Sequence, residues 1–288
     1  MTPAEPLIRS ISDTARWAAV YRARETDRPD GAFKDPFARR LAGERGEQIA
    51  QAMRFSTRHT WSWISRTVLF DEFIRAELAA GVDLVVNLAA GLDARPYRMD
   101  VPPSVRWVEV DLPELVDYKE AILANDRPKC SLERVRLDLS DVQRRRELFA
   151  RVAHGAKKAL VLTEGLIIYL TTAQVGELAR DLAAPPPFRR WITDLASPAV
   201  VRMLQKKMGG RLGEGGARLQ FGPAEGPGFF ARFGWESRGA RSMLKAAKEL
   251  RRLPFPLNLL AMLPERGGPP GERRPWSGVC LFGKAGDP

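Results

Sequence analysis

The pattern of hydrophobic positions divides the chain into a helical first part and an alternating second part. Over residues 1–80 apolar side chains recur at helical spacing, and Trp17, Val20 and Tyr21 share one face of the first expected helix. From residue 84 onward short apolar runs alternate with amphipathic segments. This alternation predicts strands joined by helices, and therefore a parallel sheet with helices on both faces.

The expected elements of the second part follow a regular order with right-handed crossovers. The expected strands are 84–89, 105–110, 134–138, 159–164, 188–194, 235–239 and 278–283, and the expected helices are 113–124, 141–153, 172–183 and 241–252. Thr171 and Gln174 have the spacing of a capping box at the start of one of these helices.

Residues 196–232 interrupt this order. They contain a short helix candidate and two runs rich in glycine and proline, which predict a mobile loop. We therefore expect a helical N-terminal part over residues 1–80 and a core over residues 81–288, with a Gly/Pro-rich insertion near 196–232.

The segment 84–95 carries the strongest chemical signal. An apolar strand ends in small residues and Gly91 before polar residues begin. Such a turn brings the backbone close to a nucleotide-like ligand. The next strand ends in Asp111, where a carboxylate can accept hydrogen bonds from both hydroxyls of a ribose. Together the two features predict a cofactor that contains adenosine.

This cofactor is expected to lack a pyrophosphate. The dinucleotide fingerprint needs three glycines, in the order G-x-G-x-x-G, so that the backbone can approach the phosphates. Here only Gly91 remains, with Ala89 and Leu92 beside it. A nicotinamide oxidoreductase is therefore disfavoured, and S-adenosyl-L-methionine (SAM) fits the pattern better.

Two later strands end in acids that would reach the same edge of the sheet. Asp138 can accept a hydrogen bond from the adenine amino group, with Leu139 packed beside the ring, and Glu164 can orient the amino end of the cofactor. Each acid alone could equally be a helix cap. Acids at the ends of successive strands favour a shared ligand.

Two arginines fall on apolar helix faces. Arg24 follows Trp17 by seven residues, and Arg66 shares a face with Trp63 on an expected helix over residues 57–80. A guanidinium group in such a place needs an anionic partner. Both arginines are therefore expected to point inward, toward an anion.

Composition narrows the class of protein. The chain has 288 residues, 44% hydrophobic and 28% charged, which is typical of a globular protein. The N-terminus does not have the pattern of a signal peptide and no run of eighteen apolar residues occurs, so we expect a cytoplasmic protein without a membrane span. Cys130 and Cys280 do not have metal-ligand spacing, so free thiols and no metal site are expected. The net charge of +11 comes largely from arginines spread along the chain, which is weak support for a nucleic-acid partner.

Several motifs support a more specific assignment. In chain order they occupy residues 12–15, 21–26, 28–30, 34–38, 90–95 (Ala-Gly-Leu-Asp-Ala-Arg), 109–113 (Glu-Val-Asp-Leu-Pro) and 164–171 (Glu-Gly-Leu-Ile-Ile-Tyr-Leu-Thr). Together they resemble the leucine carboxyl methyltransferase-like family, which includes bacterial SAM-dependent methyltransferases. The resemblance covers residues 12 to about 175, more than half of the chain, and fades after about residue 195.

The resemblance implies an α/β fold of the class I SAM-dependent methyltransferase (Rossmann-like) type. Its sheet has seven mostly parallel strands, the last one antiparallel, beneath an N-terminal helical lid. Motif matching implies the following cofactor contacts: Arg24 and Arg66 near the SAM carboxylate, Gly91 beneath the methionine part, Asp111 on the ribose, Asp138 and Leu139 at the adenine, and Glu164 as the fourth-strand acid.

The chain departs from the family pattern at two positions. The family usually has glycine where this chain has Ala89, which predicts a turn slightly farther from the ligand. Asp194 falls where we align a tyrosine that helps to hold the substrate carboxylate in the eukaryotic enzymes. An acid there repels a carboxylate unless it is paired or protonated, which argues against a protein C-terminus as substrate.

The expected function is SAM-dependent O-methylation of a small-molecule carboxylate or hydroxyl. The two histidines, His59 and His154, lie outside the motifs, so no catalytic base is assigned. This favours a carboxylate or another preactivated oxygen, which needs no base. Tyr169 is as compatible with a substrate contact as with a core position.

One alternative function is a nucleic-acid methyltransferase. Base-methylating enzymes commonly carry Asn/Asp-Pro-Pro-Tyr/Phe after the fourth strand, and the sequence Thr-Glu-Gly-Leu at 163–166 argues against this alternative. The second alternative is a SAM-binding protein without catalytic activity.

Overall fold

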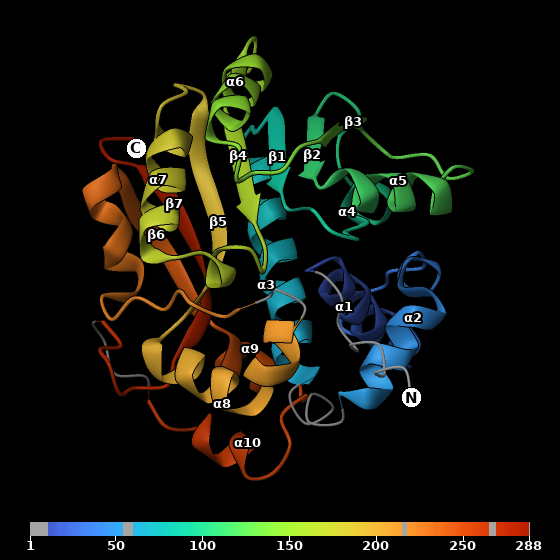
Figure 1. The fold of residues 1–288 in the computed structure, drawn as a ribbon, viewed down its shortest axis with the longest axis vertical. Coiled ribbons are helices and arrows are strands. Elements are labelled where there is room, and N and C mark those ends of the chain that lie inside the picture. The colour runs from blue at the N-terminus through green and yellow to red at the C-terminus, as the bar shows by residue number, and fades with distance from the viewer. Residues whose placement is uncertain (1–10, 54–59, 215–217, 265–268, 288) are drawn as a thin grey trace.

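A seven-stranded sheet organises the computed structural model, which describes residues 11–53, 60–214, 218–264 and 269–287 (Figure 1). In spatial order the strands are β3 (Ser131–Arg136), β2 (Arg106–Asp111), β1 (Leu84–Leu88), β4 (Ala159–Thr163), β5 (Phe188–Ala196), β7 (Ser277–Lys284) and β6 (Trp235–Ser242). Strands β1 to β5 pair in parallel, and β7 is antiparallel to both of its neighbours. The predicted class I fold, with its antiparallel last strand, is confirmed.

The central strands β1 and β4 consist entirely of buried residues. They therefore appear in the sequence as continuous apolar runs, as strands covered on both faces do. The chain passes from β1 to β2 in one direction and from β4 to β5 in the other. Ligands of open α/β sheets bind at such a reversal, outside the carboxyl ends of the strands.

Helices cover both faces and the carboxyl edge of this sheet. They are α1 (Ile11–Thr26), α2 (Ala38–Ala52), α3 (Thr60–Ala79), α4 (Arg95–Arg98), α5 (Pro113–Ile122), α6 (Val142–Ala153), α7 (Thr172–Ala183), α8 (Pro198–Glu214), α9 (Met243–Glu249) and α10 (Leu257–Leu260), together with the 3-10 helices η2 (Ile167–Tyr169) and η3 (Gly226–Phe233). The predicted capping box of Thr171 and Gln174 is present at the start of α7.

Helix α3 packs on one face of the sheet. Its residues Leu69, Phe70 and Ile74 are buried in one cluster with Val85 of β1 and Leu160 of β4. By contrast, α1 and α2 pack mainly against each other and the segment after β1, in a second cluster. Figure 1 shows these two helices beside the carboxyl edge of the sheet. Of the three helices within residues 1–80, therefore, α3 belongs to the layer that covers the sheet.

The segment expected as a mobile loop, 196–232, contains more helix than predicted. Helix α8 continues through the glycine-rich run up to Glu214, and η3 occupies the second such run. Val201 and Leu204 pack α8 into the α1–α2 cluster, and Phe229 and Phe230 bury η3 against the sheet. A helical glycine costs only about 1 kcal/mol, which tertiary packing of this kind outweighs.

Candidate functional site

A cavity of about 1360 Å³ opens at the carboxyl ends of β1, β2, β4 and β5. Helices α1, α3, α8, α9 and α10 contribute to its walls. Of the residues predicted to bind the cofactor, Arg66, Gly91, Asp111 and Glu164 line it. Four of the residues selected from the sequence therefore meet at one cavity, and their contact with a cofactor stays a prediction.

Arg24, Asp138 and Leu139 are not among the lining residues. Arg24 is 39% exposed and pairs with Glu47 of α2, with 2.7 Å between Nη2 and Oε2. Its anionic partner is therefore Glu47 on a neighbouring helix. The cavity wall contains Arg22 instead, whose Nη2 donates to the carbonyl of Leu92 at 2.5 Å.

Asp138 lies exposed after β3, where its carboxylate accepts a hydrogen bond from the N–H of Ser140 at 2.8 Å. The contact closes a local turn, whereas the N-cap of α6 is Asp141, whose side chain accepts from the N–H of Arg144. Leu139 packs beside the sheet core, and its carbonyl accepts a hydrogen bond from Arg145. The role of this pair at an adenine stays a prediction.

The turn after β1 has a left-handed backbone at two positions. Ala89 has φ = 51° and Gly91 has φ = 52°. The Cβ atom of Ala89 makes this conformation cost about 1–2 kcal/mol. The backbone is nevertheless left-handed at Ala89, although the glycine usual in the family is missing. A Cβ atom on Gly91 would lie 3.3 Å from the side chain of Ala15, because α1 approaches the turn closely.

Asp111 is held by this same turn. Its Oδ2 accepts from the N–H of Gly91 at 2.6 Å, and its Oδ1 accepts from the N–H of Leu112 at 2.8 Å. Burial raises the pKa of Asp111 above its ordinary value, although the two N–H groups oppose this shift. Each carboxylate oxygen keeps a lone pair for a further donor, as two ribose hydroxyls would require.

The centre of the buried charge network is Arg95, which the sequence analysis did not select. Its side chain is 3% exposed and contacts three carboxylates: Asp71 at 2.6 Å, Asp93 at 2.9 Å and Glu164 at 2.7 Å. Burial disfavours its charge, but the surrounding acids outweigh burial and raise the pKa of Arg95. Asp93 and Arg95 stand in the motif at 90–95, so that motif contained the signal.

Glu164 lies between two guanidinium groups. Oε2 faces Arg95, and Oε1 accepts from Nε of Arg66 at 3.0 Å. Burial favours the protonated form, but Arg95 and Arg66 outweigh it and hold the pKa of Glu164 below its usual value. The side chain is therefore a carboxylate of fixed orientation at the cavity wall.

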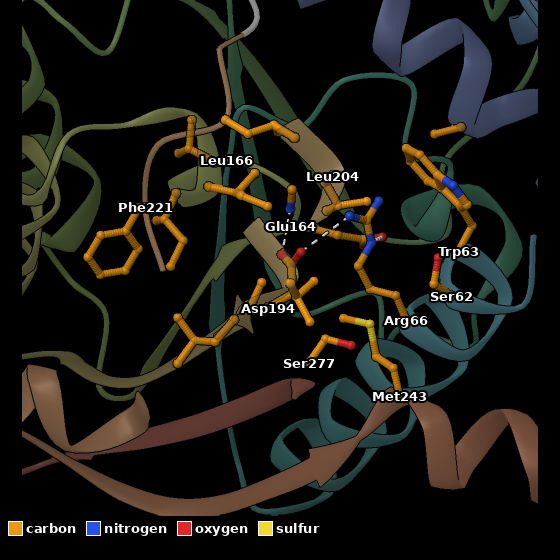
Figure 2. A pocket seen from close by; sticks show the side chains of 18 of the residues that line it. Ser62, Trp63, Arg66, Glu164, Leu166, Asp194, Leu204, Phe221, Met243 and Ser277 are labelled. Carbon is orange, nitrogen blue, oxygen red and sulfur yellow. Dashed lines mark hydrogen bonds and ion pairs between the residues drawn. The ribbon is translucent and has the colours of Figure 1, made fainter. Parts of the chain in front are cut away.

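Arg66 also contacts Asp194 at the end of β5, with 3.3 Å between Nη1 and Oδ2. The guanidinium carbon lies 4.8 Å from the ring centre of Trp63. Arg66 is thus directed inward as predicted, and its immediate anionic partners are side chains of this chain. Asp194 is therefore paired, but it shares its cationic partner with Glu164. Figure 2 shows Arg66, Glu164 and Asp194 together.

The remaining candidates for proton transfer differ in position. Tyr169 lines the cavity, and its side chain shares a hydrogen bond with Thr14 of α1. Burial raises the pKa of Tyr169. His154 is exposed at the end of α6, and His59 lies outside the described residues.

Two further sequence expectations concern metals and membranes. Within the described ranges, no group of three or more His, Cys, Asp or Glu side chains could hold a metal ion. Within the same ranges, every helix is too short or too polar to cross a bilayer. Cys130 and Cys280 are buried free thiols, as predicted.

Comparisons with known proteins agree with the fold and the motifs. Residues 15–183 match the family of leucine carboxyl methyltransferases. A "putative S-adenosyl-L-methionine-dependent methyltransferase" of Mycobacteroides abscessus is 33% identical, over 60% of this chain and 61% of that protein. Another of that description, from Streptomyces avermitilis, is 30% identical over 78% of this chain and 82% of the relative. A third, from a Parafrankia species, is 31% identical over 86% of this chain and 84% of its own length.

The chain spans about three fifths of the length of the matched proteins from Mycobacteroides abscessus and Rhodococcus jostii. Among solved structures, a putative methyltransferase from Thermobifida fusca has a TM-score of 0.62 at 18% identity, covering 97% of this chain and 96% of the other. A DUF574 family protein from Streptomyces avermitilis has a TM-score of 0.58 at 14% identity, covering 93% and 96%. At these identities the structural similarity supports the fold alone.

Proposed function

This chain belongs to the leucine carboxyl methyltransferase family, and on that premise we propose that it is a SAM-dependent methyltransferase acting on an oxygen of a small molecule. The observation that carries the proposal is the position of Asp111 beside the Gly91 turn, on the same cavity as Arg66 and Glu164. These groups converge although they come from α3, β2, β4 and the turn after β1.

The residues of the cavity fit SAM. Asp111 would accept the ribose hydroxyls, and Gly91 would allow the backbone to lie beneath the methionine part. Two of the donor groups of Arg66, Nε and Nη1, are used by protein carboxylates, so its Nη2 group remains available for the methionine carboxylate. Glu164, kept ionised by two arginines, would accept from the methionine ammonium.

When bound, SAM supplies a methyl group already activated by its positively charged sulfur. The chain's contribution is to bind and orient: proximity and alignment alone can lower a barrier by about 7–11 kcal/mol. Arg95 would orient Glu164 through their ion pair of 2.7 Å, and Glu164 in turn contacts Arg66. A carboxylate acceptor is ionised at pH 7 and needs no base, whereas a hydroxyl acceptor gains from one.

We further propose the lid that the sequence suggested. Within the predicted lid of residues 1–80, α1 and α2 would close the cavity over the core of residues 81–288, whereas α3 belongs to the layer that covers the sheet. Helix α1 supports this, because Trp17 and Ala18 line the cavity, and Arg22 connects α1 to the carbonyl of Leu92 in the turn after β1.

Calorimetry tests the cofactor assignment. We expect SAM to bind, and NAD and NADP to bind at least about 100-fold more weakly, because the turn at Gly91 does not form a pyrophosphate cradle. Tighter binding of either dinucleotide would exclude the proposal. Transfer of a radiolabelled methyl group to a metabolite extract then separates an active enzyme from an idle SAM-binding protein, which would bind SAM and transfer nothing.

A further inference from the structure

The cavity is larger than one cofactor requires. Pockets for a single drug-sized ligand span about 300–1,000 Å³, whereas this one measures about 1360 Å³. Asp111 ends β2 and Asp194 lies near the end of β5, three strands away in the sheet order. Neighbouring strands are about 4.8 Å apart, so these two acids mark regions of the cavity separated by about 14 Å.

The region on the β5 side is lined mainly by apolar side chains. We call it the acceptor chamber and define it by Leu166, Val200, Leu204, Phe221, Met243 and Leu260. Figure 2 shows Leu166, Leu204, Phe221 and Met243 around the pair of Arg66 and Asp194. Helices α8, α9 and α10 contribute four of these six residues. The chamber therefore meets the predicted cofactor site at Arg66 and extends from there toward these helices.

Asp194 is the acid at the inner end of the acceptor chamber. Its Oδ1 accepts from the N–H of Gly165 at 2.6 Å, and its Oδ2 contacts Arg66. Each oxygen keeps a lone pair for another donor. Burial raises the pKa of Asp194, and the nearby Glu164 adds to this shift, while Arg66 and the N–H of Gly165 oppose it. The carboxylate is therefore more basic than an ordinary aspartate.

The charge around Asp194 distinguishes between the two acceptor classes. Arg66 is its cationic neighbour and already faces Glu164 as well. A substrate carboxylate beside Asp194 would add a further negative group around an arginine that already faces two protein carboxylates and would also receive the methionine carboxylate of SAM, which is unfavourable. A hydroxyl would instead donate a hydrogen bond to Asp194. The other cations of the cavity lining are Arg22, Arg95, Lys245, Arg273 and Arg274. Lys245 is the one on a helix of the chamber, and its Nζ donates to the carbonyls of Ala261 and Leu263.

We propose that the methyl acceptor is a bulky, largely apolar alcohol or phenol that fills the acceptor chamber and presents its hydroxyl to Asp194, which takes the hydroxyl proton. This inference rests on the proposed function and selects between the two acceptors left open there. In the transfer the acceptor oxygen bonds to the methyl carbon while the bond from that carbon to sulfur breaks. Sulfur keeps the electron pair and becomes a neutral thioether, and the proton moves to a carboxylate oxygen of Asp194.

A matched pair of probes tests the acceptor class. The protein is saturated with S-adenosylhomocysteine and titrated at pH 7 with 2-naphthol or 2-naphthoate, which share one ring system. We expect 2-naphthol to bind at least about 10-fold more tightly, and Asp194→Asn to reduce this preference. Equal or tighter binding of 2-naphthoate, an unchanged preference in the variant, or failure of both probes to bind would overturn the inference. If S-adenosylhomocysteine itself fails to bind, the proposed function falls, and this inference with it.

Helix α10 provides a pair of variants for the chamber that does not depend on Asp194. Leu260 lines the cavity, whereas Leu259 does not, and the two are 53% and 52% exposed. We expect Leu260→Glu to weaken 2-naphthol binding at least about 5-fold and Leu259→Glu to change it less than about 2-fold. Equal effects of the two substitutions would show that the apolar wall does not receive the acceptor.

The pH profile separates proton transfer from a structural role. For methylation of 2-naphthol, we expect Asp194→Asn to lower kcat about 100-fold at pH 7, a typical loss for a general base. The loss should shrink toward pH 10, because a phenolic hydroxyl then ionises without help. A loss that does not change with pH, or no loss at all, would refute the role of Asp194 as a base.

Discussion

The two ends of the cavity differ in how their residues are held. At the charged end, Arg95 is almost fully buried and contacts Asp71, Asp93 and Glu164. At the apolar end, Leu260 and Leu263 of the lining are more than half exposed. The charged end is thus organised before any ligand binds, whereas the apolar end presents surface that an occupant would cover. We infer that the charged end determines the geometry of the bound cofactor and that the apolar end adapts to the acceptor.

The largest expected effect comes from removing the centre of the charged end. Arg95→Met should lower the free energy of unfolding by about 3–5 kcal/mol, because three carboxylates then stay buried without their shared cation. Denaturant titration measures this loss. The control is Arg75→Ala, which removes an exposed partner of the same Asp71 at 3.8 Å and should cost at most about 1 kcal/mol. Similar losses for both variants would show that the charged end is not specially organised.

The pH dependence of stability provides the next test. Asp71 is buried and Asp93 and Glu164 are partly buried, yet nearby arginines, above all Arg95, hold their pKa values below the usual range. Their contribution to stability is therefore complete above the ordinary carboxyl pKa near 4 and is lost as the pH falls through the lowered values. We expect thermal unfolding scans to show a fall in Tm below about pH 4, and Arg95→Met to flatten that fall. The pKa values of Asp194 and Asp111 are raised. These two groups therefore act in the opposite sense: their contribution to the stability of the protein is lost as the pH rises through the raised values. An equally steep fall in Arg95→Met would contradict the assignment.

A smaller effect is expected for cofactor binding. Asp111→Ala should weaken SAM by about 1.5–3 kcal/mol, the usual loss of hydrogen bonds to a charged group. Calorimetry on Asp138→Ala provides the comparison, since Asp138 is exposed and outside the cavity lining, and this position predicts a smaller change. If Asp138→Ala weakens SAM as strongly as Asp111→Ala, the adenine assignment made from the sequence is correct. Unchanged affinity in Asp111→Ala would remove the ribose assignment.

The smallest effect is expected at the apolar end. Leu263→Ser should change the free energy of unfolding by no more than about 0.5 kcal/mol, because the side chain is 62% exposed and far from full burial. Denaturant titration of Leu263→Ser, run alongside Arg95→Met, measures this change in the free energy of unfolding. A loss above about 2 kcal/mol would mean that the apolar end is as firmly packed as the charged one, and the comparison would fail.

The parts of the site that local pattern specifies were predictable. The strands around the turn, the left-handed Gly91 and the position of Asp111 follow from an apolar run, a glycine and an acid placed within a short stretch. The capping box of Thr171 and Gln174 depends on three-residue spacing. In each case the interacting groups are close in sequence or repeat with the period of one element.

The features that depend on tertiary packing have the opposite character. Arg24 was selected by helical spacing, but the choice between Glu47 and the cavity depends on where α2 packs, and its role at the cofactor stays a prediction. A short helix candidate was expected where α8 lies, but its length and the helix η3 were not, because the glycine and proline content indicated a loop. Burial of Phe229 and Phe230 holds η3 against the sheet.

From its sequence alone, then, the chain reveals its sheet, its family and the edge at which a ligand meets it, because strands, turns and caps are local and periodic. Folding alone places Arg66 against Asp194, 128 positions apart in the chain, and surrounds Arg95 with acids from three separate segments. Those pairings depend on how helices pack on the sheet, and on the need of each buried charge for a partner, which spacing along a chain does not encode.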